Sequence, residues 1–126
     1  EKLQSELSVS YLFISHDLRV VSYTSHRIAV MYLGRIVERG RADEVLRDAR
    51  HPYTRMLLDA IPDIGMSGRD RTPVQGEVPN PLSPPTGCSF HPRCPHANER
   101  CKAERPAQID VGGTVIACHA VQEGRI

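Results

Sequence analysis

The sequence predicts an α/β fold over its first half and an irregular, cysteine-containing segment at its end. Three observations support this prediction. Residues 9–61 are rich in Val, Ile, Leu and Met, whereas residues 62–108 are dominated by Pro, Gly, Arg and Asn and carry few aliphatic side chains. All 4 cysteines follow residue 87. Because burial of apolar side chains is the main force that drives folding, an ordinary hydrophobic core is expected only in the first half.

The first predicted element is a strand at residues 9–14 (V-S-Y-L-F-I). A nearly continuous apolar run of β-forming residues is typical of a strand that is buried on both faces. A helix over residues 18–23 is expected to follow, with Ser15 or Asp17 as its N-cap. This arrangement places His16 at the carboxyl end of the strand.

Two further strands are predicted at residues 27–32 and 35–38. A tight turn at Leu33 and Gly34 joins them, because Gly readily adopts the positive φ that two-residue hairpin turns require. The expected structure here is an antiparallel hairpin.

Two helices are predicted after the hairpin. The first covers residues 42–48, with Val45 and Leu46 facing inward. The second begins at Pro52, since a proline at the first helical position loses no hydrogen bond. It is expected to end before Pro62.

The composition divides the chain into three parts: a folded segment at 1–61, a linker at 62–87 and a cysteine-rich extension at 88–126. The linker holds 6 prolines with several Gly and Ser residues. Such a composition is typical either of an ordered linker or of a disordered tether.

Charge and hydropathy restrict the function classes. The net charge is +1, with 16 basic and 15 acidic residues, which is not the footprint of a nucleic-acid-binding protein. No apolar run is long enough to span a bilayer, and the charged first residues do not resemble a secretory signal. We therefore expect a cytosolic protein, in which clustered cysteines bind metal more often than they form disulfides.

The strand-end histidine is the first candidate functional residue. In α/β sheets, ligand sites lie at the carboxyl ends of strands, where the His16 imidazole can hydrogen-bond a phosphate oxygen or a water molecule. Taken alone, His16 equally fits a local capping role.

Residues 11–18 and 27–38, read together, closely resemble the end of an ABC-transporter ATPase domain. The resemblance implies a remnant of that domain with a strand, a helix, a β-hairpin and helices. It also implies that His16 is the switch histidine that contacts the γ-phosphate of ATP, with Ser15 and Asp17 supporting its loop. ATP and Mg²⁺ are then expected only in the full-length subunit.

The phosphate-binding motif G-x-x-x-x-G-K-[ST] does not occur in the sequence, nor do the Walker B and signature motifs. Phosphoryl transfer depends on all these parts acting together. Although the resemblance is to an ATPase, the chain is therefore expected to be inactive by itself.

A second series of motifs indicates the cargo. The sequence His-Pro-Tyr-Thr at 51–54, followed by residues 74–79 and 84–88, is similar to the C-terminal extension of oligopeptide and dipeptide importers; nickel importers share it. The resemblance implies uptake of peptides, with nickel as the alternative. It also implies a location on the inner face of the cell membrane, with a second ATP-binding subunit, transmembrane permease subunits and, indirectly, a peptide-binding protein as partners.

The cysteines are spaced C-x5-C-x6-C-x16-C and are Cys88, Cys94, Cys101 and Cys118. Four thiolates bind either a [4Fe–4S] cluster or a tetrahedral zinc ion. The close C-x2-C pairs of zinc sites do not occur, and the resemblance implies a [4Fe–4S] cluster. Zinc, free thiols and disulfides are the alternatives.

Other side chains near the cysteines are candidates for supporting roles. Three histidines could substitute for a ligand or donate a hydrogen bond to one; they are His91, His96 and His119. Three basic residues are expected to offset the charge of a thiolate-bound centre; they are Arg93, Arg100 and Lys102. Because few large apolar side chains surround the cysteines, a metal is expected to order this segment structurally.

Two other function classes compete with a transporter segment. One is an autonomous iron–sulfur or zinc module with a structural or sensing role. The other is a small enzyme that uses His16 as a base, although no partner nucleophile or acid stands near it in sequence. A strand such as 9–14 normally lies inside a parallel sheet, and without its neighbours it exposes its edges and apolar faces. The isolated chain is therefore expected to self-associate or to exchange strands.

Overall fold

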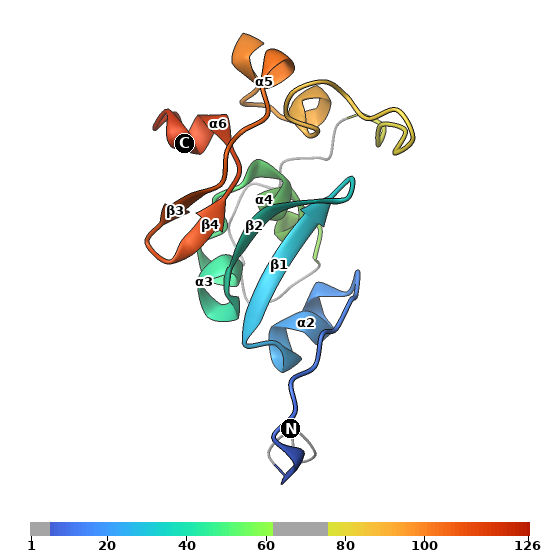
Figure 1. Cartoon of the computed structure of the whole chain (residues 1–126), viewed down its shortest axis with the longest axis vertical. Coiled ribbons are helices and arrows are strands. Elements are labelled where there is room, and N and C mark those ends of the chain that lie inside the picture. Colours follow the sequence, from blue (N-terminus) through green and yellow to red (C-terminus); the bar gives the residue numbers. More distant parts are fainter. Residues whose placement is uncertain (1–5, 62–75) are drawn as a thin grey trace.

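The computed structural model describes residues 6–61 and 76–126, and its central feature is a four-stranded antiparallel sheet (Figure 1). The strand order is β1-β2-β4-β3. The strands are β1 (Arg27–Tyr32), β2 (Arg35–Arg41), β3 (Ile109–Val111) and β4 (Thr114–Ile116). The sheet therefore joins a hairpin from the first half of the chain to a hairpin from its end.

The predicted hairpin is confirmed. Leu33 and Gly34 form the turn with φ values of 43° and 75°, the two positive dihedrals expected of a tight hairpin turn. Strand β2 continues to Arg41, which is three residues beyond the prediction, because Arg41 still pairs with Arg27. Alternate residues of β1 are buried, as period-2 side-chain geometry requires.

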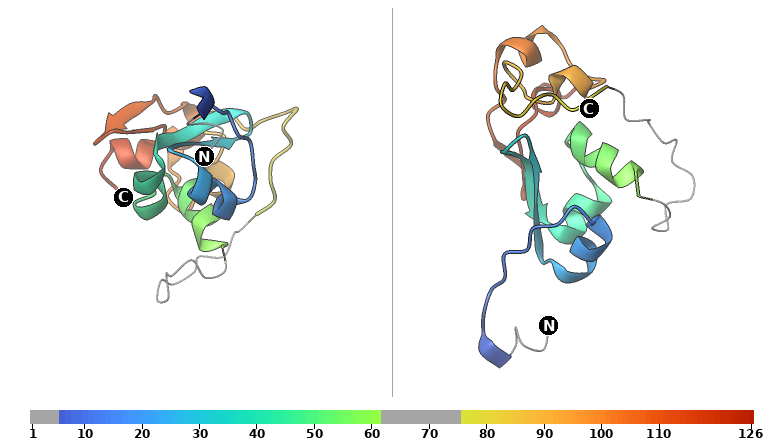
Figure 2. Two further views of the ribbon diagram at one scale, coloured as in Figure 1. Left: turned by 90° about the horizontal axis from the view of Figure 1, so that it is seen from below. Right: turned by 90° about the vertical axis from the view of Figure 1, so that its right-hand side faces the viewer.

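Three helices lie on one face of the sheet (Figure 2). They are α2 (Leu18–Thr24), α3 (Ala42–Arg47) and α4 (Pro52–Asp59), which match the predicted helices closely. Asp17 caps α2 by accepting a hydrogen bond from the backbone N–H of Arg19 at 2.9 Å. In α3, Val45 is fully buried, whereas Leu46 is only half-buried.

The predicted strand at residues 9–14 does not form, and that prediction is wrong for this structure. The segment has no regular structure, and its side chains are exposed, with Leu12 at 93% and Ile14 at 90%. A strand needs neighbours to accept and donate its backbone hydrogen bonds. No described strand pairs with this segment, which extends beyond the end of the sheet (Figure 1).

The cysteine-rich extension is more regular than expected. It contains a short 3₁₀ helix η1 (His91–Arg93), the helices α5 (Glu99–Ala103) and α6 (His119–Gln122), and the β3–β4 hairpin. Strand β4 pairs with β2 through Glu38↔Ile116 and Arg39↔Val115. The extension is thus attached to the first half of the chain by a shared sheet.

One aromatic side chain also connects the two halves. Phe90 is 2% exposed and belongs to the same core cluster as Ile28 and Val45. Its ring lies 5.2 Å from that of Tyr32 and 5.5 Å from that of Tyr53, centroid to centroid. A second, smaller core forms around Ile116, Cys118 and Ala120.

The predicted division at 1–61, 62–87 and 88–126 stays a prediction, and residues 62–75 of the linker lie outside the described residues. Within the ranges that the structure describes, no helix combines the length and the apolar character needed to cross a membrane.

Candidate functional site

His16 lies in a short loop that its neighbours hold in place. The Ser15 Oγ accepts a hydrogen bond from the backbone N–H of Asp17 at 2.9 Å, and Asp17 in turn caps α2. The His16 side chain is exposed. The loop is therefore fixed locally while the imidazole faces solvent, and the role predicted for His16 stays a prediction.

The four cysteines come from four separate segments. Cys88 follows the Gly87 turn, Cys94 ends η1, Cys101 lies in α5 and Cys118 precedes α6. Cys101 and Cys118 are buried, and all four are free thiols. The fold thus gathers residues that are up to thirty positions apart in sequence.

The thiols are close enough to influence one another. Burial raises the pKa of Cys94 to about 11, and the charges of Cys118, Cys88 and Cys101 act in the same direction. Burial also raises the pKa of Cys88 and of Cys118. Among the described residues, however, no three His, Cys, Asp or Glu side chains have an arrangement that could hold a metal ion. The four thiols are neighbours but are not arranged as a closed set of ligands.

Close backbone packing positions the first and third cysteines. The backbone N–H of Cys88 donates to the Cys101 carbonyl at 2.8 Å. Gly87 allows this approach, because it has φ 67° and a Cβ there would stand 2.4 Å from the Cys101 carbonyl oxygen. Asn98 caps α5 by accepting from the Cys101 N–H at 3.0 Å. Only glycine fits at position 87 without displacing one of the two segments.

The fourth cysteine is carried by the sheet. The backbone N–H of Ala117 donates to the Val37 carbonyl at 2.9 Å, which continues the contact of β4 with β2 up to Cys118. Cys118 therefore directly follows the residue through which this end of β4 is bonded to the hairpin of the first half.

Of the histidines near the cysteines, His119 is the most enclosed, with 2% exposure. Its Nε2 is 3.0 Å from the carbonyl oxygen of Glu104, and its buried Nδ1 has no hydrogen-bond partner. Because a carbonyl only accepts, Nε2 carries the hydrogen and neutral His119 has a bare Nδ1. The other two histidines are less enclosed. The Nδ1 of His91 lies 3.0 Å from the Cys88 carbonyl oxygen. Burial lowers the pKa of His96, and the charges of Arg55 and Arg125 act in the same direction.

Two of the three basic residues expected to offset the cysteine charge form ion pairs with glutamates instead. Arg100 binds Glu104 and Glu123 at 3.2 and 3.1 Å. Lys102 binds Glu99 at 2.6 Å.

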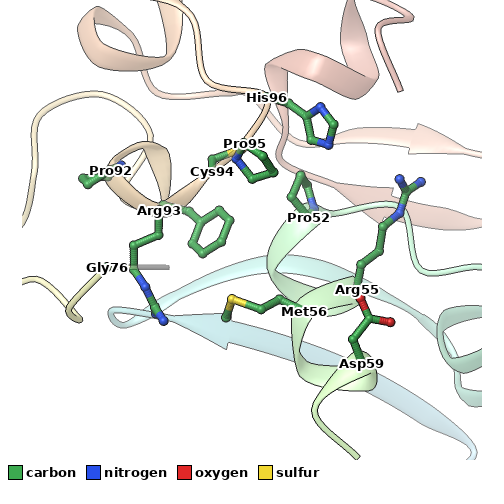
Figure 3. A pocket seen from close by; sticks show the side chains of 11 residues that line it. Pro52, Arg55, Met56, Asp59, Gly76, Pro92, Arg93, Cys94, Pro95 and His96 are labelled. Carbon is green, nitrogen blue, oxygen red and sulfur yellow. The ribbon is translucent and has the colours of Figure 1, made fainter. Parts of the chain in front are cut away.

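The third of these basic residues, Arg93, also points away from its neighbouring cysteine. It extends from η1 toward Gly76, away from Cys94 (Figure 3). Arg125 is the arginine whose charge acts on a cysteine: burial raises the pKa of Cys118, and the charge of Arg125 opposes that rise. Sequence reasoning missed it because it lies seven positions beyond the last cysteine.

A buried carboxylate was also missed. Glu38 in β2 is 0% exposed and accepts hydrogen bonds from the backbone N–H groups of Arg50 at 2.8 Å and His51 at 3.2 Å. His51 in turn caps α4, since its Nδ1 accepts from the Tyr53 N–H at 3.1 Å. Burial lowers the pKa of His51 to about 4, although a hydrogen bond with the Ala117 backbone acts in the opposite direction. The His-Pro-Tyr-Thr motif thus docks α4 on the sheet.

A pocket of about 560 Å³ opens between α4 and η1 (Figure 3). Its lining includes Arg55, Met56, Phe90, Arg93 and Cys94. Cys94, which is half-buried, thus lies in the wall of this pocket.

Comparisons with known proteins place the chain in a family. Residues 37–101, about half of the chain, match the model of the oligopeptide/dipeptide transporter C-terminal region. The chain is 49% identical, over 93% of its length, to the probable peptide ABC transporter ATP-binding protein y4tS of Sinorhizobium fredii. It is 46% identical, over 96% of its length, to the dipeptide transport ATP-binding protein DppF of Escherichia coli.

A third relative gives a similar result, with 43% identity over 94% of the chain to the oligopeptide transport ATP-binding protein AppF of Bacillus subtilis. The chain spans only 34%, 36% and 37% of the lengths of these three relatives, respectively. All three are named as ATP-binding proteins, two of them for dipeptide or oligopeptide transport and one as a peptide ABC transporter component. The chain therefore belongs to the oligopeptide/dipeptide transporter C-terminal region family.

Proposed function

We propose that this chain is the C-terminal segment of the ATP-binding subunit of an ABC importer that couples ATP hydrolysis to uptake of oligopeptides or dipeptides. The observation that carries the proposal is the match to peptide-transport ATP-binding proteins over more than nine-tenths of the chain. The nickel alternative has less support, since none of these relatives is named for nickel transport. Both classes of peptide stay in the proposal, because the dipeptide and oligopeptide relatives match almost equally well, at 46% and 43% identity.

In the complete subunit, His16 is proposed to contact the γ-phosphate of ATP. Its exposed imidazole and the hydrogen bonds of Ser15 and Asp17 support this role, because they present the side chain from a loop of fixed shape. The groups that bind the remaining phosphates and Mg²⁺ must come from outside residues 1–126, which contain no phosphate-binding loop. Alone, the chain is expected to hydrolyse no ATP.

The proposed partners follow from the same function. They are a second ATP-binding subunit, transmembrane permease subunits and, indirectly, a peptide-binding protein. The proposed location is the cytoplasmic face of the cell membrane, held there by the permease. The exposed apolar side chains of residues 9–14 support the proposal that this segment packs against the rest of an ATPase domain, since the described parts of the chain do not cover them.

We further propose that the four cysteines bind a metal centre, with a [4Fe–4S] cluster as the first candidate and zinc as the alternative. The residue types suit such a centre, because four free thiols come from four segments and soft sulfur ligands bind iron–sulfur clusters and zinc. They are not yet in closed ligand geometry, so binding requires the loops to draw together. When bound, the group supplies a structural cross-link among Cys88, Cys94, Cys101 and Cys118.

The role of His16 is tested in the full-length subunit within its transporter. His16→Ala is expected to lower ATP hydrolysis by about 100-fold, the scale for losing one positioned hydrogen-bonding group at a transition state, and to abolish peptide uptake. The matched control is His26→Ala, which removes another exposed histidine nearby. If His16→Ala hydrolyses ATP and imports peptide as the wild type does, the proposed role is wrong.

The metal proposal is tested by elemental analysis of anaerobically purified protein. About four irons per chain are expected for a [4Fe–4S] cluster, and one zinc for the alternative. Replacing each cysteine by serine in turn is expected to lower the metal content. Full retention of thiol reactivity with no bound metal contradicts the proposal.

A further inference from the structure

A second pocket, of about 490 Å³, lies where the β1–β2 hairpin meets the extension. Its lining comes from the turn end of that hairpin, from residues 87–90 and from residues within 105–117. The volume falls in the range of about 300 to 1,000 Å³ that is usual for small-molecule sites. The pocket is distinct from the one between α4 and η1, although Phe90 lines both.

Hydrogen bonds between separate parts of the chain hold the walls of this hairpin pocket. The backbone N–H of Ala117 donates to the Val37 carbonyl at 2.9 Å, which joins the β2 wall to the end of β4. The Gln122 side chain donates to the Ala107 carbonyl at 2.7 Å, which ties a third wall to α6. The segment at 87–90 is tied to α5 by the backbone bond between the first and third cysteines. Because the walls are held before any ligand arrives, little ordering is needed on binding.

The charged side chains that line the hairpin pocket are both arginines, Arg35 at the start of β2 and Arg105 shortly after α5. Both are exposed, and neither guanidinium has a hydrogen-bond or ion-pair partner in the described parts of the chain. The described lining includes no acidic side chain, in contrast to the α4 pocket, where Asp59 accompanies Arg55. Positive charges around a hollow with partly apolar walls attract anions more strongly than charges on an open surface do.

The rest of the lining is apolar or carries neutral polar groups. The large apolar side chains are those of Met31, Ile36, Val37, Phe90 and Pro106. Ser89 and Gln108 supply neutral hydrogen-bonding groups, and Tyr32 adds a buried hydroxyl that has no hydrogen-bond partner among the described residues. Buried polar groups in folded proteins are almost always paired, so this hydroxyl calls for a partner such as water or a ligand.

From this lining we propose that the hairpin pocket binds a small organic anion: Arg35 and Arg105 bind its carboxylate or phosphate group, and its apolar body lies against the side chains of Met31 and Phe90. The planar fork of a guanidinium matches two oxygens of either group. A ligand that also carried an ammonium group would find no carboxylate in the described lining to pair with it. The site therefore favours a simple anion over a zwitterion, and it needs no metal at the cysteines.

The inference is tested by nuclear magnetic resonance on the isotope-labelled full chain, with a reductant present and at low ionic strength. The probes are phenylacetate, phenyl phosphate and, as the cationic counterpart of the same size, benzylamine. Both anions are expected to shift the amide signals of Gly34, Ser89 and Gln108 in a saturable way, and benzylamine to leave them in place. Because surface charges are screened by salt, the affinity for both anions is expected to fall as salt is added.

Variants then identify the groups that bind the anion. Replacing both arginines, Arg35→Gln with Arg105→Gln, is expected to weaken binding of both anions by about tenfold or more, the scale for losing hydrogen bonds to a charged group. Arg39→Gln is the matched control, since Arg39 is an exposed arginine of the same strand that does not line the pocket. Unchanged amide signals away from the pocket verify that each variant is folded.

The relative affinity of the two anions names the preferred group, and either order supports the inference. Shifts by benzylamine equal to those by phenylacetate would mean that the pocket accepts apolar rings without recognising charge, which overturns it. Equal affinities for the wild type, the double variant and Arg39→Gln overturn it too, and so do shifts that rise without saturation at arginines over the whole surface.

Discussion

The segment at residues 9–14 and strand β4 have similar side chains, but the first is exposed to solvent and the second is buried in a sheet. Both are short and contain β-branched or aromatic side chains, yet Leu12 and Ile14 are 93% and 90% exposed whereas Ile116 is 0% exposed. The two segments differ in the number of strands that pair with them. Strand β4 has β2 on one side and β3 on the other, while residues 9–14 pair with no described strand. In this chain, burial of a strand depends on having neighbours more than on its hydropathy.

The largest expected effect concerns the unpaired segment. At high concentration the isolated chain is expected to self-associate through residues 9–14, and Leu12→Asp combined with Ile14→Asp is expected to make it monomeric. Burying two such side chains contributes about 3 to 6 kcal/mol to association. Light scattering over a wide concentration range measures this, and a wild-type chain that stays monomeric throughout contradicts it. Leu82→Asp is the matched control, since Leu82 is also 93% exposed but lies elsewhere.

The second-largest effect is a loss of stability expected from a change in β4, the strand that is paired on both sides. Ile116→Ala is expected to destabilise the chain by about 2 to 5 kcal/mol, because the cavity forms where β4 is enclosed by its neighbours. Chemical denaturation of the monomeric Leu12→Asp, Ile14→Asp background provides the measurement. Val115→Ala, one residue earlier and on the other face of β4, is expected to have a clearly smaller effect. Equal losses for the two variants would show that β4 is not anchored through Ile116.

The elements that sequence predicted well are those set by local rules. The turn at Leu33 and Gly34, the Asp17 cap and the helix start at Pro52 each depend on residues within about one turn of chain. Their signals are steric or are short-range hydrogen bonds, so spacing alone reveals them. The same rules fail for residues 9–14, because pairing partners are not a local property.

The candidate site also has a part that the sequence predicts and a part that only the folded chain shows. The residue types and spacing of the cysteines are visible in the sequence, but their convergence depends on the pairing of β4 with β2 and on the close approach at Gly87. Arg125 shows the limit most clearly. Glycine is common at the ends of helices, yet only the folded chain shows that the reversal after α6 brings the Arg125 guanidinium to the His96 carbonyl at 2.6 Å.

A smaller effect is expected from the contact between α4 and the end of β4, through His51. Since the folded pKa of His51, about 4, lies below its ordinary value of 6.5, the native state binds fewer protons than the unfolded state between these values. Stability is therefore complete above pH 6.5 and falls as the pH drops toward 4, by roughly 3 kcal/mol. Denaturation at a series of pH values measures the slope. His51→Gln is expected to flatten it and His26→Gln to leave it unchanged, whereas a slope that survives in His51→Gln would assign it to another group.

The smallest expected effect concerns the hydrogen bonds by which Glu38 of β2 holds the residues just before α4. In Glu38→Gln, one carboxylate oxygen becomes an NH₂ group that faces the backbone N–H of either Arg50 or His51. Because two donors then meet in a fully buried place, unfolding is expected to become easier by about 1 to 3 kcal/mol. Glu99→Gln makes the same chemical change at a carboxylate whose side chain is 89% exposed, and it is expected to shift stability by less than about 0.5 kcal/mol. If the two variants have equal stability in denaturant, the Glu38 carboxylate does not dock α4 on the sheet.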